Sequence, residues 1–84
     1  MTILIDRLRK YPPQNNPYPD EEWSHLVSDA SLEELHDFAA SLGLKRKWFQ
    51  HSHYDCTKNK YAKAIQLGAC PVTSAELVKR MVKP

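Results

Sequence analysis

The stretch SHLVSDASLEELHDFAASLG, residues 24–43, decides most of the fold, because a strand signal runs directly into a helix start. Its short aliphatic run predicts a strand over residues 24–27. Ser31 and Glu34 then form the S-x-x-E pattern that satisfies free N–H groups in the first turn of a helix. Apolar residues recur at helical spacing after this point, which predicts a helix over residues 32–42.

Further strand and helix signals lie on both sides of this stretch. The sequence predicts strands over residues 2–5, 48–55 and 70–73, and helices that start after Thr57 and Thr73. Alternation of strands with helices favours parallel pairing through right-handed crossovers. We therefore expect an α/β fold, with a small mainly parallel four-stranded sheet and three helices.

The length of 84 residues suits a single domain over residues 1–84. A proline-rich loop is expected within it over residues 11–22, where four of the six prolines lie. Their fixed φ angles and missing N–H donors exclude regular structure. A loop of this length often serves function or faces a partner. Because a small core is commonly aided by a metal or by self-association, we also expect a homo-oligomer.

The charge is small overall but unevenly distributed. The net charge is +2, residues 20–37 are acidic and residues 45–63 are basic. Two solvated helix faces explain this division, although it could also orient an anionic ligand or pair two subunits. Cys56 and Cys70 are too few for a disulfide scaffold, and the chain shows no signal peptide and no membrane-length apolar run. These features predict a cytoplasmic protein that makes no membrane contact.

Polar residues follow the predicted strands. In parallel α/β sheets, ligands bind beyond the carboxyl ends of the strands, where helix N-termini favour anions. This rule selects Asp6, Ser28, Asp29, residues 53–57, Thr73 and Ser74. We expect these turns to meet at one edge of the sheet and to form a ligand site.

His51, His53 and Asp55 alternate along the chain, so an extended segment would point all three to one face. Two imidazoles and a carboxylate suit a divalent metal. The pattern lacks the spacing of a zinc signature, and an exposed His51 beside a packed His53 explains it equally well. No cofactor is predicted, and a divalent metal stays open, with His53 and Asp55 as its ligands.

Two other histidines have similar alternatives. His25 lies in the second predicted strand, and His36 lies beside the apolar face of the first predicted helix. Either could be a hydrogen-bonded core residue. Either could also act as a base or donate to phosphate, because imidazole titrates near neutral pH.

Basic residues surround the histidine-rich segment, and aromatic residues lie among them. Cations near aromatic rings suit a nucleotide or a single-stranded nucleic acid. We favour instead an interpretation in which Trp48 and Phe49 are core residues and the lysines form a solvated rim. Nucleic acid is therefore not an expected partner, and no glycine-rich phosphate loop is present.

The order of polar and apolar residues between 23 and 78 resembles the domain of unknown function 4031 family of small bacterial and phage proteins. The resemblance is carried by Trp23-Ser24-His25-Leu26-Val27-Ser28-Asp29, Leu35-His36, Phe38-Ala39, Leu42-Gly43-Leu44, Phe49-Gln50, His53-Tyr54-Asp55, Gly68-Ala69 and Val72. It implies no particular activity. It does imply a shared set of site residues, from which His51 departs: His25, Asp29, His36, Gln50, His53, Tyr54 and Asp55.

Three functions are compatible with this sequence. The leading one is a binding module that holds a phosphate-bearing small molecule such as a nucleotide, for example to sequester a nucleotide signal. The alternative is a metal-dependent hydrolase of phosphate esters, with His53 and Asp55 as ligands and His25 or His36 as acid or base. The third is a protein-interaction module that uses the proline-rich loop. The sequence leaves the choice between enzyme and binding protein open.

Overall fold

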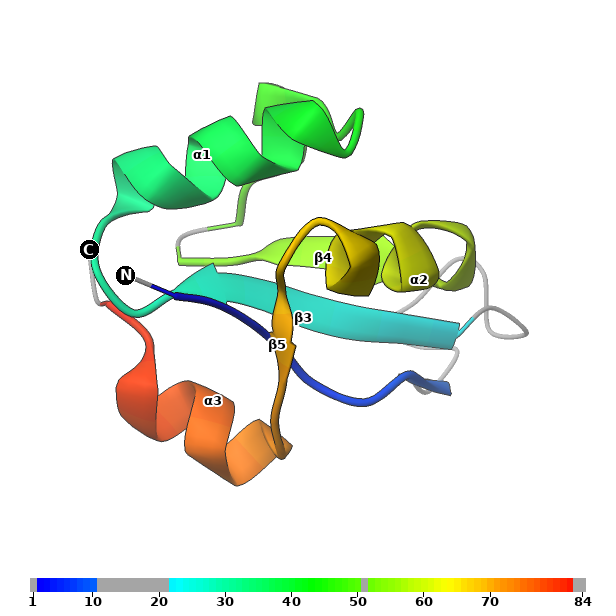
Figure 1. Ribbon diagram of the computed structural model, residues 1–84, viewed down its shortest axis with the longest axis vertical. Coiled ribbons are helices and arrows are strands. Elements are labelled where there is room, and N and C mark those ends of the chain that lie inside the picture. The colour runs from blue at the N-terminus through cyan, green and yellow to red at the C-terminus, as the bar shows by residue number, and fades with distance from the viewer. Residues whose placement is uncertain (1, 11–21, 51, 83–84) are drawn as a thin grey trace.

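The computed structural model describes residues 2–10, 22–50 and 52–82, which form a sheet with helices on both faces (Figure 1). The strands are β1 (Ile3–Ile5), β2 (Arg9–Lys10), β3 (Glu22–Ser28), β4 (Tyr54–Thr57) and β5 (Cys70–Pro71). The helices are α1 (Leu32–Ser41), α2 (Lys58–Gln66) and α3 (Ser74–Arg80), with the 3₁₀ turn η2 (Arg46–Trp48). His51 and, apart from its last residue, the predicted proline-rich loop lie outside the described residues.

β3 is the central strand of a five-stranded sheet. It pairs antiparallel with β4 along one edge and with both β1 and β2 along the other, whereas β1 and β5 are parallel. The predicted α/β class is confirmed. The predicted mainly parallel four-stranded sheet is wrong, because the sheet has five strands and most of its pairings are antiparallel.

The reason lies in the connection between β3 and β4. α1 runs back along the sheet from the end of β3, and residues 43–50 then lead the chain toward the end where α1 began (Figure 1). β4 therefore enters beside Leu26 and runs against β3. The predicted strand start at Trp48 is also wrong, because this residue belongs to η2 and β4 begins only at Tyr54.

The junction between β3 and α1 is held by serine hydroxyls. Ser28 accepts hydrogen bonds from the backbone N–H groups of Ala30 (3.0 Å) and Ser31 (3.1 Å), and it donates to the Glu34 carboxylate (2.6 Å). The Ser31 hydroxyl accepts from the backbone N–H of Glu34 at 3.1 Å and caps α1, as predicted. The Glu34 side chain binds Ser28 rather than the cap residue, so this is half of a capping box.

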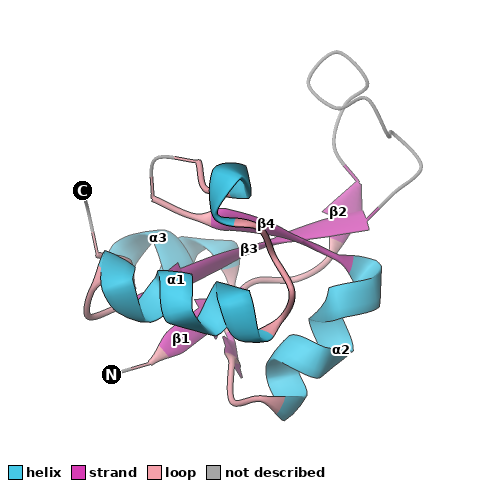
Figure 2. Cartoon of the chain, turned by 90° about the horizontal axis from the view of Figure 1, so that it is seen from above, coloured by secondary structure: helices cyan, strands magenta, loops and turns pink. Residues whose placement is uncertain are grey.

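Two apolar clusters place helices on opposite faces of the sheet, as Figure 2 shows from a second direction. α1 and α2 pack over the face that holds Leu26 and Tyr54, and α3 packs over the face that holds Leu4 and Val27. Successive strand residues point to opposite faces. The odd-numbered positions of β3 therefore lie on the second face, which we call the α3 face.

Within the described residues, no helix has the length and apolar character needed to cross a membrane. Cys56 is buried and Cys70 is exposed, and both are free thiols. Burial raises the pKa of Cys56 to about 11, so this residue stays protonated at neutral pH.

Leu26 offers a test of the core, because it is fully buried beneath the helices. Replacement by alanine should lower the free energy of unfolding by about 2–5 kcal/mol through reduced burial and a residual cavity. Leu67 is 46% exposed, so the same change there should cost less than about 1 kcal/mol. Denaturant titration measures both values, and equal losses would contradict the packing described.

Candidate functional site

Asp6 lies in a β-bulge between β1 and β2. Residues 6–8 oppose only residues 24–25 of β3, so this edge of the ladder carries one extra residue. The backbone N–H of Asp6 donates to the His25 carbonyl at 3.3 Å, while the backbone N–H of His25 donates to the Asp6 carboxylate at 2.6 Å. A side-chain oxygen thus replaces a backbone carbonyl in the ladder. Bulges of this kind re-aim side chains and occur often beside active sites.

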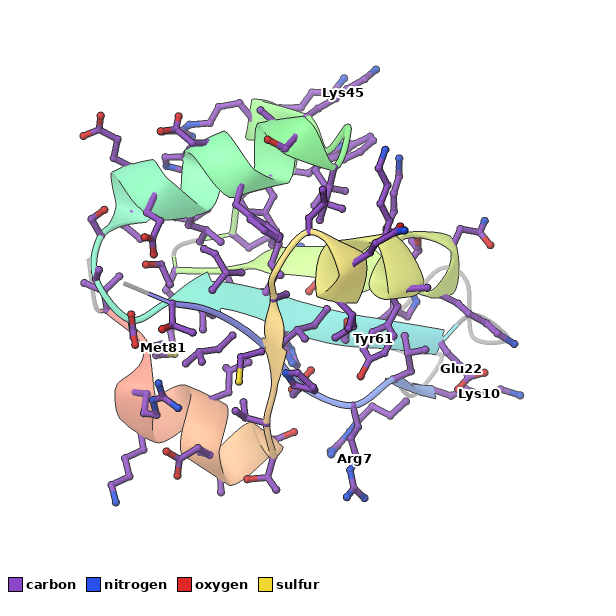
Figure 3. The ribbon with its side chains drawn as sticks, viewed as in Figure 1. Arg7, Lys10, Glu22, Lys45, Tyr61 and Met81 are labelled. Atoms are coloured by element: carbon purple, nitrogen blue, oxygen red, sulfur yellow. The ribbon has the colours of Figure 1, made fainter. Side chains whose placement is uncertain are left out.

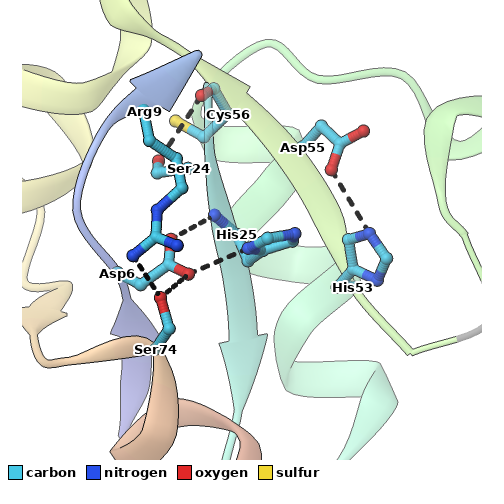
Figure 4. A network of polar contacts seen from close by, with 8 residues as sticks. All are labelled: Asp6, Arg9, Ser24, His25, His53, Asp55, Cys56 and Ser74. Carbon is cyan, nitrogen blue, oxygen red and sulfur yellow. Dashed lines mark hydrogen bonds and ion pairs between the residues drawn. The ribbon is translucent and has the colours of Figure 1, made fainter. Parts of the chain in front are cut away.

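The same carboxylate holds the His25 ring (Figure 4). The second oxygen of Asp6 lies 2.8 Å from His25 Nδ1 and accepts a hydrogen bond from the Ser74 hydroxyl at 3.0 Å. Arg9 Nη2 in turn donates to that hydroxyl at 3.1 Å. Asp6 is only 1% exposed, whereas the His25 side chain is 33% exposed. A buried acid therefore orients a ring that solvent can reach.

A second pair lies on the neighbouring strand. His53 Nε2 is 3.2 Å from Asp55 Oδ1, and Gln50 Nε2 donates to the other oxygen of Asp55 at 2.8 Å. Reciprocal backbone hydrogen bonds between Gln50 and His53, at 2.8 and 3.1 Å, close the turn that leads into β4. Because His53 and Asp55 are two residues apart in extended chain, they point to one face, as predicted.

The two pairs converge on the α3 face. His25 is the register partner of Asp55 across β3 and β4, and the rings of His25 and His53 meet edge to face with centroids 5.0 Å apart. One ligating atom from each of His25, His53 and Asp55 lies within 4.8 Å of the others. Ligands of a single ion at about 2 Å would lie within about 4 Å of one another, so a small closure would complete a metal site.

Electrostatic effects support the ionised forms of both carboxylates. Burial opposes ionisation of Asp6, but hydrogen bonds from the His25 ring and backbone outweigh it, and the pKa of Asp6 is lowered. Burial likewise opposes ionisation of Asp55, but the hydrogen bond and charge of His53 lower its pKa. The hydrogen bond to Asp6 raises the pKa of His25, against the effect of partial burial. Both carboxylates therefore stay ionised in mildly acidic solution, while the His25 ring is protonated more readily than an ordinary histidine.

Residues 3–84 match the family described as protein of unknown function (DUF4031). The chain belongs to this family. No curated protein matches the chain, and no solved structure does either.

The site residues implied by the resemblance to the DUF4031 family do not all line one cleft. The structure brings four of them together: His25, Gln50, His53 and Asp55. The remaining three form two separate contacts, each of which gives its members structural partners.

His36 of α1 and Tyr54 of β4 meet on the opposite face of the sheet. The Tyr54 hydroxyl is 2.9 Å from His36 Nδ1, and the Phe49 ring packs edge to face on His36 at 4.6 Å. Burial lowers the pKa of His36 and raises the pKa of Tyr54, so both are neutral near pH 7. Alternation along β4 points Tyr54 away from Asp55. The pair cannot reach the α3 face.

Asp29 follows the end of β3 and links the residue before β1 to the last residue of α3. Its carboxylate accepts hydrogen bonds from the Thr2 backbone N–H at 2.8 Å and from Arg80 at 3.3 Å. The hydrogen bond from Thr2 lowers the pKa of Asp29 against a smaller effect of desolvation, and Arg80 adds to this lowering. These contacts account for the residue without a ligand.

Three further members of the site lie outside the set implied by the family resemblance: Asp6, Arg9 and Ser74. Asp6 and Ser74 are among the residues that the strand-end rule selects, whereas Arg9 is not. Arg9 gave no signal, because an arginine in a short exposed strand looks like ordinary surface. His51 lies outside the described residues.

A shallow groove of about 420 Å³ lies elsewhere, between the start of β1 and α1. Its lining includes the acidic residues Glu34 and Asp37 and the apolar residues Phe38 and Leu67. None of the predicted site residues lines it. The cluster of His25, His53 and Asp55 therefore lies apart from this hollow, on the α3 face.

Replacing Asp6 with asparagine tests how the carboxylate acts on His25. The amide oxygen can still accept from the His25 backbone, but the negative charge is removed, so the pKa of His25 should fall toward or below its ordinary value of 6.5. NMR titration of the imidazole resonances in chelator-treated protein measures this. The exposed Asp37→Asn change is the matched control. An unaltered pKa in the Asp6 variant would contradict the assigned contact.

The same pair makes stability depend on pH. The raised pKa of His25 contributes stability that is fully present below pH 6.5 and is lost as the pH rises through the folded-state value. The lowered pKa of Asp6 contributes stability that is present above pH 3.8 and is lost as the pH falls through the folded-state value. Denaturant titration at a series of pH values measures this dependence. As the pH rises above 6.5, the free energy of unfolding should fall less for Asp6→Asn than for the native chain.

Proposed function

We propose that this protein is a divalent-metal-dependent hydrolase of phosphate esters, with His25, His53 and Asp55 as the metal ligands. The observation that carries the proposal is the convergence of two imidazoles and a carboxylate within 4.8 Å from two adjacent strands. Two of the ligands are each held by a further residue, His25 by Asp6 and Asp55 by Gln50, which a chance cluster would not require.

The donor set suits a reactive metal site. Catalytic zinc sites use three protein ligands and keep a further position for water or substrate, whereas structural sites are closed by four. The side chains of His25, His53 and Asp55 are 33%, 26% and 34% exposed, so a bound ion would be accessible from solvent. Two histidines with one carboxylate also suit iron and other divalent transition metals.

Neighbouring residues hold these ligands in place. Asp6 binds His25 Nδ1, so a metal would be ligated by the other ring nitrogen, in the carboxylate–histidine–metal arrangement common in such sites. Gln50 donates to Asp55 Oδ2 and thereby turns Oδ1 toward His53. The side chains of His25 and Asp55 are thus oriented without a bound ion, and a small closure of the three ligands would complete the site.

Arg9 supports a phosphate-bearing substrate. Its guanidinium is anchored to Ser74, and its positive charge has a small effect on His25 that opposes protonation of that ring. An exposed arginine beside the ligands can pair with phosphate oxygens through its planar fork of donors. A divalent ion here would polarise a phosphoryl oxygen and lower the pKa of a bound water.

In this proposal the histidines have roles that differ from those expected from the sequence. His25 would serve as a ligand, so it would not be the acid or base. His36 lies on the other face with Tyr54 and has no path to the site. Proton transfer in this proposal therefore involves water bound at the site and no further histidine of the described residues.

A binding module without turnover is the second candidate. The raised pKa of His25 favours imidazolium when no metal is bound, and this cation with Arg9 would hold a phosphate-bearing molecule such as a nucleotide. Sequestration of a nucleotide signal remains a prediction of this alternative. A homo-oligomer, a cytoplasmic location and an interacting proline-rich loop likewise remain predictions.

Metal binding and turnover test the proposal together. Zn²⁺, Mn²⁺ and Fe²⁺ are titrated by calorimetry, and release of p-nitrophenol from p-nitrophenyl and bis(p-nitrophenyl) phosphates is followed with and without chelator. Loss of an outer partner typically costs about 10–100-fold in metal affinity, so Asp6→Asn should do so and His53→Ala or Asp55→Asn should lose at least as much. Asp37→Asn, the same chemical change at an exposed position, should leave both readouts unchanged.

The outcomes separate the candidates. Metal binding with chelator-sensitive hydrolysis supports the hydrolase. Tight binding of ATP by the chelated protein, with ATP recovered intact, would favour the binding module. Metal affinity unchanged by both ligand substitutions would refute the site itself.

A further inference from the structure

A basic surface lies over the α1 side of the sheet, away from the His25–His53–Asp55 site. Between residues 38 and 75 the chain has a single acidic residue, Asp55, which faces the other side. Lys45, Arg46 and Lys47 are consecutive and exposed there. With Trp48 and Lys60 they form what we call the Lys45–Trp48 surface.

The turn η2 presents Trp48 to solvent. Leu44 on one side is buried and Phe49 on the other packs against the core, so the turn is anchored at both ends. Trp48 between them is 45% exposed, in contrast to the core position predicted for it. Lys45 Nζ lies 5.7 Å from the centre of the indole, and Figure 3 shows Lys45 extended away from the helices.

Lys60 brings a further charge to this surface from α2. Gly43, with φ +83°, ends α1, and Lys60 Nζ lies only 3.1 Å from where a side chain on that glycine would begin. Arg46 stacks over Phe49 at 5.3 Å. Within the described residues, no ion pair neutralises Lys45, Arg46, Lys47 or Lys60. One exposed indole thus has Lys45 beside it and three more unneutralised cations on the same turn or on the neighbouring helix.

We infer that the Lys45–Trp48 surface binds single-stranded nucleic acid, with the indole stacked on an unpaired base and the four cations beside the phosphates. Base–aromatic stacking with an electrostatic contribution from the backbone is how sequence-tolerant single-strand binders work. Duplex DNA offers no unstacked base to Trp48. An acidic protein would satisfy the cations but would leave the indole without a matching surface.

A membrane is a weaker match. Interfacial binding requires a broad apolar face beside the basic one. Among the described residues the large exposed apolar side chains are Trp48, Leu67 and Val78, which belong to three different segments. A single exposed ring suits a base better than it suits a bilayer.

Fluorescence anisotropy with a labelled oligothymidine of about 15 nucleotides tests the inference. Chelator is present throughout, so the result is independent of the proposed metal site. Trp48→Ala should weaken binding by about tenfold or more while the salt dependence stays the same. Lys45→Ala with Lys47→Ala should instead lower the slope of log K against log salt by about 0.7 for each phosphate that the protein no longer neutralises. Lys79→Ala on α3 removes one exposed lysine away from this surface and is the control, which should change neither.

Three results would overturn the inference: oligothymidine binding that Trp48→Ala leaves intact, equal affinity for a duplex of the same length, or preferential binding to polyglutamate or phosphatidylserine vesicles. Circular dichroism of each variant shows whether it is folded. Because Trp48 is largely exposed and outside the core, Trp48→Phe should fold and should restore part of the affinity.

Discussion

The contact between Asp6 and His25 is the interaction on which the rest of the structure depends. A carboxylate that is 1% exposed is costly to bury unless hydrogen bonds and charge compensate it. Asp6 receives the His25 backbone N–H, the His25 ring and the Ser74 hydroxyl. One side chain therefore closes the bulge between β1 and β2, attaches the start of α3 and sets the direction of a histidine.

This constraint explains why the histidine–carboxylate cluster lies on the α3 face. α3 packs over Leu4 and Val27. The part of the α3 face that carries His25 is left partly exposed to solvent. His25 comes from the central strand, whereas His53 and Asp55 come from the neighbouring strand and its turn. Because antiparallel pairing places His25 directly opposite Asp55, the register that forms the core also assembles the donors.

The sequence contained part of this arrangement. The cap at Ser31 predicted the start of α1, and the alternation of His53 and Asp55 predicted their common face. Strand direction could not be predicted, because the return segment after α1 carries no distinctive pattern. Trp48 was assigned to a buried strand because aromatic residues favour strands, but its exposure depends on a turn that tertiary packing imposes.

The site residues implied by the family resemblance show a second limit of prediction from the sequence. Seven polar residues in one pattern suggested one cleft, yet three of them serve buried or bridging contacts elsewhere in the fold. Polar groups that must be satisfied inside a small domain and polar groups that bind ligands look alike in a sequence. Only the alternation of strand faces separates Tyr54 from Asp55, and only the bulge reveals why Asp6 belongs with His25.

Anomalous diffraction from crystals grown with Zn²⁺ tests the central claim most directly. An ion held by His25, His53 and Asp55, with Asp6 still bonded to the far nitrogen of His25, is the predicted result. A fully occupied zinc on other residues, with these three side chains turned apart, would contradict the account.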